Sequence, residues 1–497
     1  MSDSASLPPP PERVPTGVKG LDHVLGGGVF KSGIYILGGQ PGVGKTILAN
    51  QACYHHVKHG GRALYITLLA ETHARMLGQL QTLSFFDPAA VGTSVLYVNG
   101  FSPLVSEGLQ GLLQLVRRVV RDHKATLLVL DGMVTAEHLA NSNIDYKRFI
   151  NELQTWVGVI GCTVLLLTSG HDEAKVMPEH TMVDGIIELQ LETRRARTMR
   201  FIQISKFRGS GFNEGRHAYA ISDDGIAIYP RLEAVCEERG HVSIGPEQLP
   251  SGIPGLDELI GGGIAQRSTT LLLGSSGAGK TLCGLQFLAE GIRRKDSCMH
   301  FGFFESPPAL LETARRFGFD FEKALKKDLL AIEWRKPSEQ VLDELGQHLL
   351  QVVQERKVTR LFIDGLVGFK DQEFPERVSG FFSALCTELQ RRGVTTFITE
   401  ETRELYVQNI VVPTGGVSAI FQNIFFLRQN VGSAEAQRII SVMKTRESAH
   451  TATPHTFTIG DSGVVVDGVY ESGSPTDTGA GLIPTALPQK RSTKRRG

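Results

Sequence analysis

Two eight-residue stretches decide the fold of this 497-residue chain: Gly39-Gln40-Pro41-Gly42-Val43-Gly44-Lys45-Thr46 and Gly274-Ser275-Ser276-Gly277-Ala278-Gly279-Lys280-Thr281. Both satisfy the pattern G-x-x-x-x-G-K-[ST], 235 positions apart. An apolar run typical of a strand precedes each stretch, and a segment able to form a helix follows it, at 47–57 and 282–292. That context predicts two phosphate-binding loops, because the glycines let backbone N–H groups turn toward phosphate oxygens at a helix N-terminus.

The residue types in each loop indicate a nucleotide ligand. A lysine at the seventh position is expected to reach the β- and γ-phosphates, and the threonine hydroxyl can bind Mg²⁺. The expected nucleotide-binding residues are Gly39, Gly42, Gly44, Lys45 and Thr46 in the first loop and Gly274, Gly277, Gly279, Lys280 and Thr281 in the second. The sequence therefore predicts two ATP-type sites per chain, with Mg²⁺ as the companion ion.

The duplication extends well beyond the loops. Upstream, Thr16-Gly17-x-x-Gly20-Leu21-Asp22 is echoed by Ser251-Gly252-x-x-Gly255-Leu256-Asp257 at the same offset. Downstream, apolar runs end in Asp131 and in Asp364. An acid at the end of such a strand is the usual Mg²⁺ partner in phosphate-loop proteins, so both are expected metal ligands together with the loop threonines. The alternative is an aspartate that only caps the following turn.

This repetition predicts two whole domains in series, since its period is too long for a solenoid. We expect a Pro-rich lead at 1–14, a first domain at 15–232, a polar linker at 233–247, a second domain at 248–470 and a disordered basic tail at 471–497.

Within each half, short apolar runs alternate with amphipathic stretches. In the first half the expected strands are 34–37, 63–68, 127–130, 163–167 and 185–190. Their lack of polar alternation indicates strands buried on both faces, hence a mainly parallel sheet between helices. Later segments at 198–206, 218–221 and 226–229 indicate added antiparallel hairpins. The predicted fold class is α/β, with two tandem doubly wound phosphate-loop domains; RecA-like is the form of this fold that the family resemblance described below implies.

The composition narrows the function classes. Hydrophobic residues make up 41% and charged residues 21%, and the formal net charge is zero, so there is no global attraction to nucleic acid or membrane. The six cysteines contain no C-x-x-C pair, which predicts small core residues in a reducing compartment. No apolar run is long enough for a membrane span, and no secretory signal pattern opens the chain. A cytoplasmic location is expected.

Two further groups of side chains are candidates for catalysis. Lys206 and Arg208 in the first half correspond to Lys444 and Arg446 in the second, each pair on a late strand with both side chains on one face. Such cations can stabilise the γ-phosphate of a neighbouring subunit, or they are ordinary exposed strand charges.

A general base is expected after the second strand of each half, where the chain offers Glu71 and Glu305. The alternative for both is an acid favoured at a helix N-terminus. Weaker candidates for sensing the γ-phosphate end the fourth strands. They are Thr168-Ser169 in the first half and Thr399-Glu400-Glu401 in the second.

Taken together, the T-G-x-x-G-L-D lead, the two loops, the strand-end acids and the K-x-R pairs resemble the KaiC family of RecA-like ATPases over residues 14 to 475. The resemblance implies a double-ring hexamer with ATP bound between neighbouring subunits, ATP hydrolysis and serine/threonine autokinase activity in the second domain. It also implies an unknown signalling partner. Assembly through a head-to-tail interface fits a site completed by a cation from the next subunit.

The chain departs from the family pattern at two places. Family members carry two adjacent glutamates after the second strand, whereas Ala70 and Phe304 stand here before the remaining acids. Loss of a positioned base costs about 10²–10⁴ in rate, so slow hydrolysis is expected. At the phosphorylation segment, Ser418 is present but Ala419 replaces the threonine.

Three functions therefore compete: a slow ATPase signalling ring with possible autokinase activity on Ser418, a nucleotide-stabilised scaffold with little turnover, and a DNA-directed motor. The neutral charge argues against the third.

Overall fold

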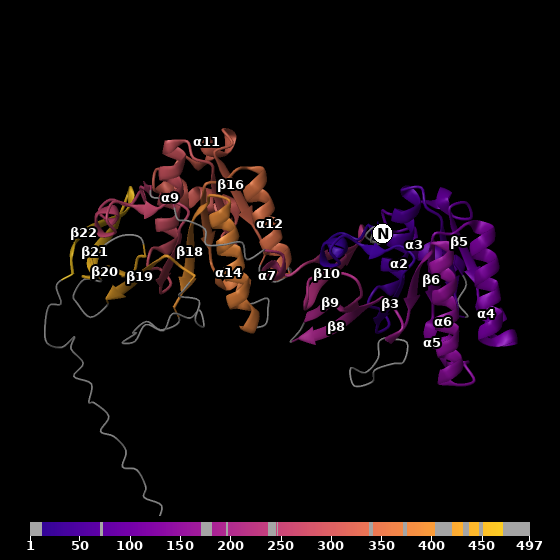
Figure 1. Ribbon diagram of the computed structural model, residues 1–497. Coiled ribbons are helices and arrows are strands. Elements are labelled where there is room, and N and C mark those ends of the chain that lie inside the picture. The colour runs from indigo at the N-terminus through magenta and orange to yellow at the C-terminus, as the bar shows by residue number, and fades with distance from the viewer. Residues whose placement is uncertain are drawn as a thin grey trace, which may run out of the picture. The chain divides into compact units, whose positions relative to one another are not determined.

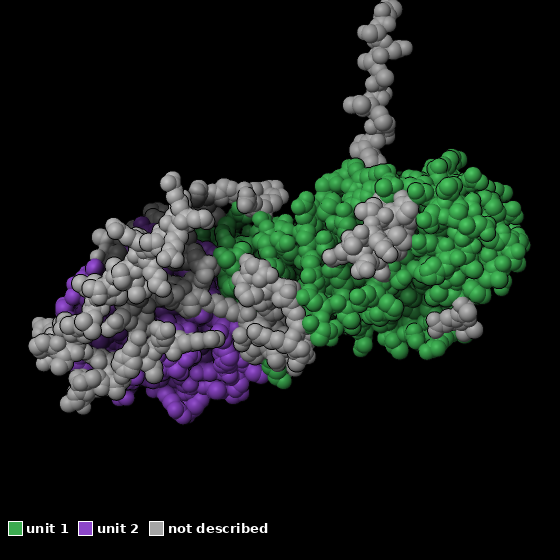
Figure 2. All heavy atoms as spheres, turned by 90° about the horizontal axis from the view of Figure 1, so that it is seen from below, with its two compact units in different colours: residues 1–243, 336–357, 368–392 green, residues 244–335, 358–367, 393–497 purple. Residues whose placement is uncertain are grey.

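The computed structural model describes residues 12–69, 73–169, 181–194, 197–236, 245, 247–336, 341–370, 375–402, 420–430, 437–446 and 451–470. By spatial proximity the chain divides into two compact units (Figure 2). The first comprises residues 1–243, 336–357 and 368–392, and the second comprises 244–335, 358–367 and 393–497. The first unit thus includes two helices from the second half of the sequence, α12 (Leu342–Glu355) and α14 (Pro375–Arg391).

A nine-stranded sheet forms the centre of the first unit (Figure 1). Its spatial order is β11 (Gly225–Tyr229), β10 (Arg216–Ser222), β9 (Arg197–Phe207), β8 (Gly185–Arg194), β3 (Ile34–Gly39), β7 (Thr163–Leu167), β6 (Leu127–Asp131), β4 (Ala63–Thr67) and β5 (Val95–Asn99). The strands from β8 to β5 run parallel, and β9, β10 and β11 add antiparallel hairpins.

Helices cover both faces of the parallel part of this sheet. The odd-numbered residues of β3, such as Tyr35 and Leu37, pack with helix α2 (Lys45–Lys58). The even-numbered residues, such as Ile34 and Ile36, pack with α4 (Phe101–His123), α5 (Met133–His138) and α6 (Asn143–Ile160). Burial on both faces explains why the strands lack polar alternation. The remaining helices of this half are α1 (Leu21–Val24), α3 (His73–Leu80), α7 (Leu232–Val235) and the 3₁₀ turn 88–90.

The second unit repeats the same sheet. Its order is β16 (Leu330–Trp334), β15 (Cys298–Gly302), β17 (Arg360–Asp364), β18 (Thr395–Glu401), β14 (Thr269–Gly274), β19 (Asn423–Asn430), β20 (Gln437–Lys444), β21 (His455–Gly460) and β22 (Gly463–Val469). Strands β16 to β19 are parallel and the last three are antiparallel. One face packs against α9 (Lys280–Arg294), α10 (Pro307–Arg316) and α11 (Phe321–Lys326). The predicted tandem α/β fold is confirmed.

Short elements complete the two halves. Strand β1 (Arg13–Val14) pairs with β2 (Val29–Phe30), and β12 (Gln248–Leu249) pairs with β13 (Ile264–Ala265). Helix α8 (Leu256–Leu259) repeats α1, and α13 (Val367–Lys370) follows β17. No helix that the structure describes is both long and apolar enough to cross a bilayer. All six cysteines are free thiols, as expected.

Two details differ from the sequence prediction. The edge strand β5 was not predicted; it is as long as β6 and β7, but only its first residue is fully buried. The predicted placement of both K-x-R pairs on strands is wrong for the arginines. Strand β9 ends at Phe207, since Gly209 turns the chain with φ of 84°, and Arg446 lies beyond the end of β20 at Lys444.

A charged cluster fixes the short helix α7 to α12 and α14 within the first unit. The Arg377 guanidinium donates to both carboxylate oxygens of Glu233 at 3.0 Å and to both of Asp343 at 3.0 and 3.1 Å. Asp343 is fully buried and also accepts from the backbone N–H of Leu232 at 3.0 Å. Paired and hydrogen-bonded in this way, the buried charges hold α7 in a single position.

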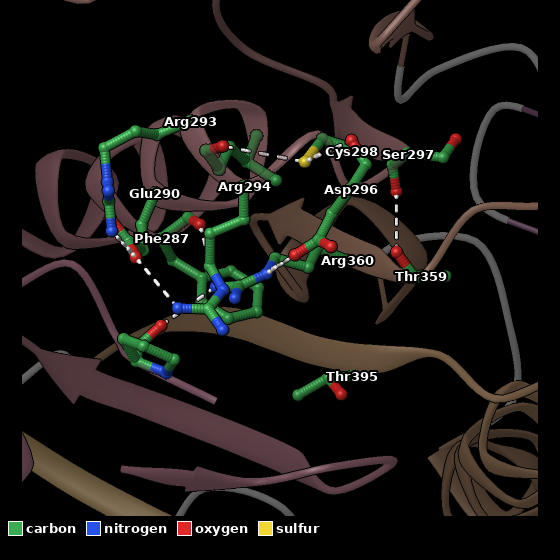
Figure 3. A network of polar contacts seen from close by, with 12 residues as sticks. Phe287, Glu290, Arg293, Arg294, Asp296, Ser297, Cys298, Thr359, Arg360 and Thr395 are labelled. Carbon is green, nitrogen blue, oxygen red and sulfur yellow. Dashed lines mark hydrogen bonds and ion pairs between the residues drawn. The ribbon is translucent and has the colours of Figure 1, made fainter. Parts of the chain in front are cut away.

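A second buried charge stabilises the sheet of the second unit at the start of strand β17. The side chain of Arg360 on β17 is fully buried and lies over the ring of Phe287 in α9, at 4.9 Å from its centroid. It donates to Asp296 Oδ2 at 2.8 Å and to the carbonyl of Pro250 at 2.9 Å (Figure 3). One guanidinium therefore ties together the end of α9, strand β17 and the start of the repeat.

Replacing Arg360 by methionine should lower the free energy of unfolding of the second unit by about 3 kcal/mol, because Asp296 and the buried carbonyls lose their donor. Trp334 on β16 can report this by fluorescence in urea, once Trp156, the other tryptophan, is changed to Phe. The matched control is Arg294→Met, at an arginine whose side chain is 45% exposed, which should cost under about 0.5 kcal/mol. Equal losses for both variants would contradict the assignment.

Candidate functional site

Both predicted phosphate loops connect a central strand to a helix. The first joins β3 to α2, which begins at Lys45, and the second joins β14 to α9, which begins at Lys280. The residue before each helix, Gly44 or Gly279, has a left-handed backbone with φ of 99° or 96°. Only glycine adopts this conformation without strain, so the sharp turn that points the N–H groups inward depends on it.

The first glycine of each loop has a separate role, which is close packing. A Cβ atom at Gly39 would lie 2.4 Å from the carbonyl oxygen of Leu189 on β8. A Cβ atom at Gly274 would lie 2.3 Å from that of Leu427 on β19. The loop can therefore start beside the neighbouring strand only without a side chain.

The two loop lysines fold over their own loops. Lys45 Nζ donates to the carbonyls of Gly39 and Gln40 at 2.5 and 3.0 Å, and Lys280 Nζ donates to those of Gly274 and Ser275 at 2.9 and 2.7 Å. Burial lowers the pKa of both ammonium groups. Each ammonium is thus held over the concave side of its loop, where a phosphate would take the place of the carbonyls as its partner.

The strand-end acid of the first half faces the loop threonine. Asp131 ends β6, and its Oδ2 lies 3.4 Å from Thr46 Oγ1. The buried Tyr65 on β4 donates to the same oxygen at 2.7 Å. Burial and then the charge of Asp131 raise the pKa of Tyr65 well above its ordinary value, which keeps it a hydrogen-bond donor.

In the second half, the corresponding acid accepts its hydrogen bonds from a different set of side chains. Asp364 ends β17, with Oδ2 3.1 Å from Thr281 Oγ1. Its other oxygen accepts from Thr399 Oγ1 on β18 at 2.7 Å. Burial raises the pKa of Asp364, and the bonds from Thr399 and Thr281 oppose that rise. At the position of Tyr65 the second half has His300 on β15, which is fully enclosed and for whose ring nitrogens the described part of the chain offers no hydrogen-bond partner.

This donor set fits Mg²⁺. A threonine hydroxyl and a carboxylate oxygen are the protein ligands that Mg²⁺ takes beside nucleotide phosphates. The described residues contain no group of three or more His, Cys, Asp or Glu side chains placed to hold a metal ion. Phosphate oxygens and water would supply the remaining ligands of a cation at either site.

Around the first loop lies a cleft of about 590 Å³, a size typical of small-molecule sites. Lys45, Thr46 and Asp131 line it, together with the candidate sensors Thr168 and Ser169. His73 lines it as well, with Nε2 3.0 Å from Thr67 Oγ1. Sequence reasoning missed His73, because a histidine at a helix start has no signature and only the fold brings it to the cleft.

The predicted general bases have different outcomes. Glu305 follows β15, and its Oε2 is buried without a hydrogen-bond partner among the described residues. Burial and then repulsion from Asp364 raise its pKa, so the two acids lie near one another. Glu71 and Ser418 lie outside the described residues, and their roles stay predictions.

Three of the four predicted trans cations donate to backbone carbonyls. Lys206 Nζ and Arg208 Nη2 both donate to the carbonyl of Thr181, at 3.2 and 2.5 Å. Lys444 Nζ donates to the carbonyl of Phe421 at 2.8 Å. The described residues lining the first cleft do not include Lys206 or Arg208.

Comparison with known proteins assigns the family. The family model described as "ATPase: KaiC" matches residues 14–233 and again 249–470. The chain belongs to the KaiC ATPase family. It is 25% identical over 482 residues to the circadian clock oscillator protein KaiC of Picosynechococcus sp., covering 94% of this chain and 92% of that protein. It is 25% identical over 485 residues to KaiC 1 of Synechocystis sp., with 94% and 92% covered.

A third relative, KaiC of Prochlorococcus marinus, is 24% identical over 465 residues, covering 91% of this chain and 92% of the relative. The matches thus extend over both halves of the chain. Family membership makes the protein a KaiC-like ATP-binding protein with ATPase domains.

The enclosed His300 gives the second unit a defined pH dependence. Burial lowers the pKa of His300 from 6.5 to about 3, so below pH 6.5 the unfolded chain binds a proton that the folded chain excludes. The free energy of unfolding should fall by about 2 kcal/mol between pH 7 and pH 5 from this group alone. His300→Phe should remove that part of the pH dependence in urea titrations, whereas His59→Gln, at an exposed histidine, should retain it. An unchanged slope in His300→Phe would contradict the prediction.

Proposed function

We propose that this protein hydrolyses ATP slowly at two Mg²⁺-dependent sites and acts as a nucleotide-dependent signalling ring. The observation that carries the proposal is the acid left in the second site. Glu305 has a buried oxygen without a hydrogen-bond partner among the described residues, and burial followed by repulsion from the strand-end acid Asp364 raises its pKa. A carboxylate held in this way is available to accept a proton from an attacking water.

The other residues have roles that follow from their positions. Lys280 and the loop N–H groups bind the phosphates, and Thr281 with Asp364 binds Mg²⁺, which supplies charge neutralisation at the γ-phosphate when bound. Glu305 orients the water and takes its proton. In the first half Lys45, Thr46 and Asp131 have the same roles.

Slow turnover is proposed because the position before each acid is apolar. Phe304 stands before Glu305, with 63% of its surface exposed, and its ring packs over Gly365, where an added Cβ would lie 2.8 Å from a ring carbon. A phenyl ring next to the acid also favours a second candidate function. In this alternative, ATP binding stabilises a scaffold and turnover is incidental.

The rate of phosphate release, measured in variants that retain only one intact nucleotide site, distinguishes slow ATP hydrolysis from the scaffold function. In a Lys45→Ala background, which leaves the second site, Glu305→Gln should reduce the rate by about 10²–10⁴ and keep ATP affinity within a few-fold, since the amide cannot accept the proton. The raised pKa of Glu305 also predicts that the rate increases with pH through that pKa. Glu71→Gln in a Lys280→Ala background is the corresponding test of the first site.

The control is Glu322→Gln, at an exposed acid on α11, which should leave the rate unchanged. If Glu305→Gln releases phosphate as fast as its parent, or if the parent releases none while binding ATP, the scaffold function replaces the ATPase.

The ring itself is part of the proposal. The relatives are circadian clock oscillator proteins, and we propose for this chain a homohexamer with ATP at subunit interfaces that signals to a protein partner. Lys206 and Arg208 are not among the described residues that line the cleft of their own half, which suits contact with a neighbouring subunit. Serine autokinase activity on Ser418 is proposed as a possible further activity of the second half.

Native mass spectrometry with and without ATP tests the assembly. ATP and Mg²⁺ should yield a species of six chains. Lys206→Ala with Arg208→Ala should lower first-site turnover by about 10³ or more while ATP binding persists, since a trans cation acts on the transition state. The control is Arg62→Ala, at an exposed arginine of the same unit. A monomer under both conditions would contradict the ring and the trans assignment together.

A further inference from the structure

The two phosphate loops differ in the strand beside them. Leu37 on β3 pairs with Leu167 on β7, and the equivalent Leu272 on β14 pairs with Thr399 on β18. The two residues that follow are therefore counterparts. They are Thr168 and Ser169 in the first half and Glu400 and Glu401 in the second. Two neutral hydroxyls in one site are replaced by two carboxylates in the other.

The backbone of these two glutamates lies beside the phosphate loop, with the Glu400 side chain buried and the Glu401 side chain exposed. Glu401 pairs in register with Gly274, the first loop glycine, and Glu400 pairs with Leu273. The next residue, Thr402, donates its N–H to the carbonyl of Gly274 at 3.0 Å. The same carbonyl accepts from Lys280 Nζ at 2.9 Å, so the strand end and the loop lysine share one attachment point.

The lysines consequently have different electrostatic surroundings. The charges that act on Lys280 are those of Glu401, Asp364 and Glu400, in that order, although burial has the larger influence on its pKa. The charge that acts in this way on Lys45 is that of Asp131. The strand beside the second loop thus contributes two carboxylates where the strand beside the first loop has two hydroxyls.

This difference has a consequence for an incoming polyanion. Triphosphate brought to the second loop meets two carboxylates that the first loop lacks, and each repels it by an amount that corresponds to about a tenfold change in affinity at short range in a protein site. A divalent cation bound to the phosphates removes most of that repulsion, because it offsets two negative charges where they are closest.

We propose that Glu401, together with Glu400, restricts the second site to the divalent-metal complex of the nucleotide, whereas the first site also binds metal-free nucleotide. The inference rests on the proposed nucleotide sites but not on turnover. It makes the second site the one that responds to the supply of free divalent cation, and it assigns to the two carboxylates a role in ligand selection.

Equilibrium binding of radiolabelled ATP tests the proposal on the full chain, with excess MgCl₂ or excess EDTA. Lys45→Ala isolates the second site and Lys280→Ala isolates the first. EDTA should weaken binding at the second site by about 100-fold more than at the first, as two added carboxylates predict. In the Lys45→Ala background, the exchange Glu400→Thr with Glu401→Ser should abolish this excess. In the Lys280→Ala background, Thr168→Glu with Ser169→Glu should create it in the first site.

Two further variants keep the test independent of folding. Glu401→Gln changes only an exposed side chain and should reduce the excess by about tenfold, whereas Glu322→Gln on α11 should not alter it. The proposal is overturned if Glu401→Gln and the double exchange leave the EDTA effect unchanged, or if both isolated sites respond to EDTA equally. Phosphate release measured on the same samples distinguishes the ATPase proposal from the metal-selection proposal. If the samples release no phosphate but still differ in their response to EDTA, only the ATPase proposal is contradicted.

Discussion

The parallel register of the central strands is the constraint on which the rest of the structure depends. Because β3 and β6 run in the same direction on either side of β7, the loop that leaves β3 and the acid that ends β6 emerge at one edge of the sheet. Thr46 and Asp131 are 85 positions apart in sequence, yet their side-chain oxygens lie 3.4 Å apart. The second half repeats this arrangement with Thr281 and Asp364. A ligand of phosphate and Mg²⁺ needs both groups, and only this topology supplies them together.

The two halves have the same sheet topology, but different side chains donate hydrogen bonds to their strand-end acids. The strand-end acid of the first site accepts a hydrogen bond from Tyr65, one strand away on the side of β4. In the second site the donor is Thr399, from β18 on the opposite side, and the place of the tyrosine is taken by the enclosed His300. Two sites with the same loop sequence therefore have different electrostatics, so they need not have the same ligand preference or rate. A doubled motif indicates two binding sites more securely than two equal activities.

Much of this organisation could be predicted from the sequence, because the signals are local. A few consecutive residues are enough to recognise each signal: glycines before a lysine, an apolar run without polar alternation, or an aspartate at the end of such a run. The less regular features were not predictable. The edge strand β5 is mostly only half-buried, unlike the central strands of equal length, and the end of β9 before Arg208 depends on the turn at Gly209. His73 enters the first cleft through the path of the chain between β4 and α3, which no local pattern specifies.

The sequence by itself determined the fold class, the tandem repeat, the two phosphate loops and the identity of the acids that face them, since all of these depend on residue type and spacing along the chain. Only the tertiary structure decided which groups surround each site. The contacts of Asp364 with Thr399 and of Asp131 with Tyr65 join segments from different strands, and the charges of Glu400 and Glu401 at the end of β18 act on Lys280. Their strength depends on burial and distance, which exist only after the strands have paired.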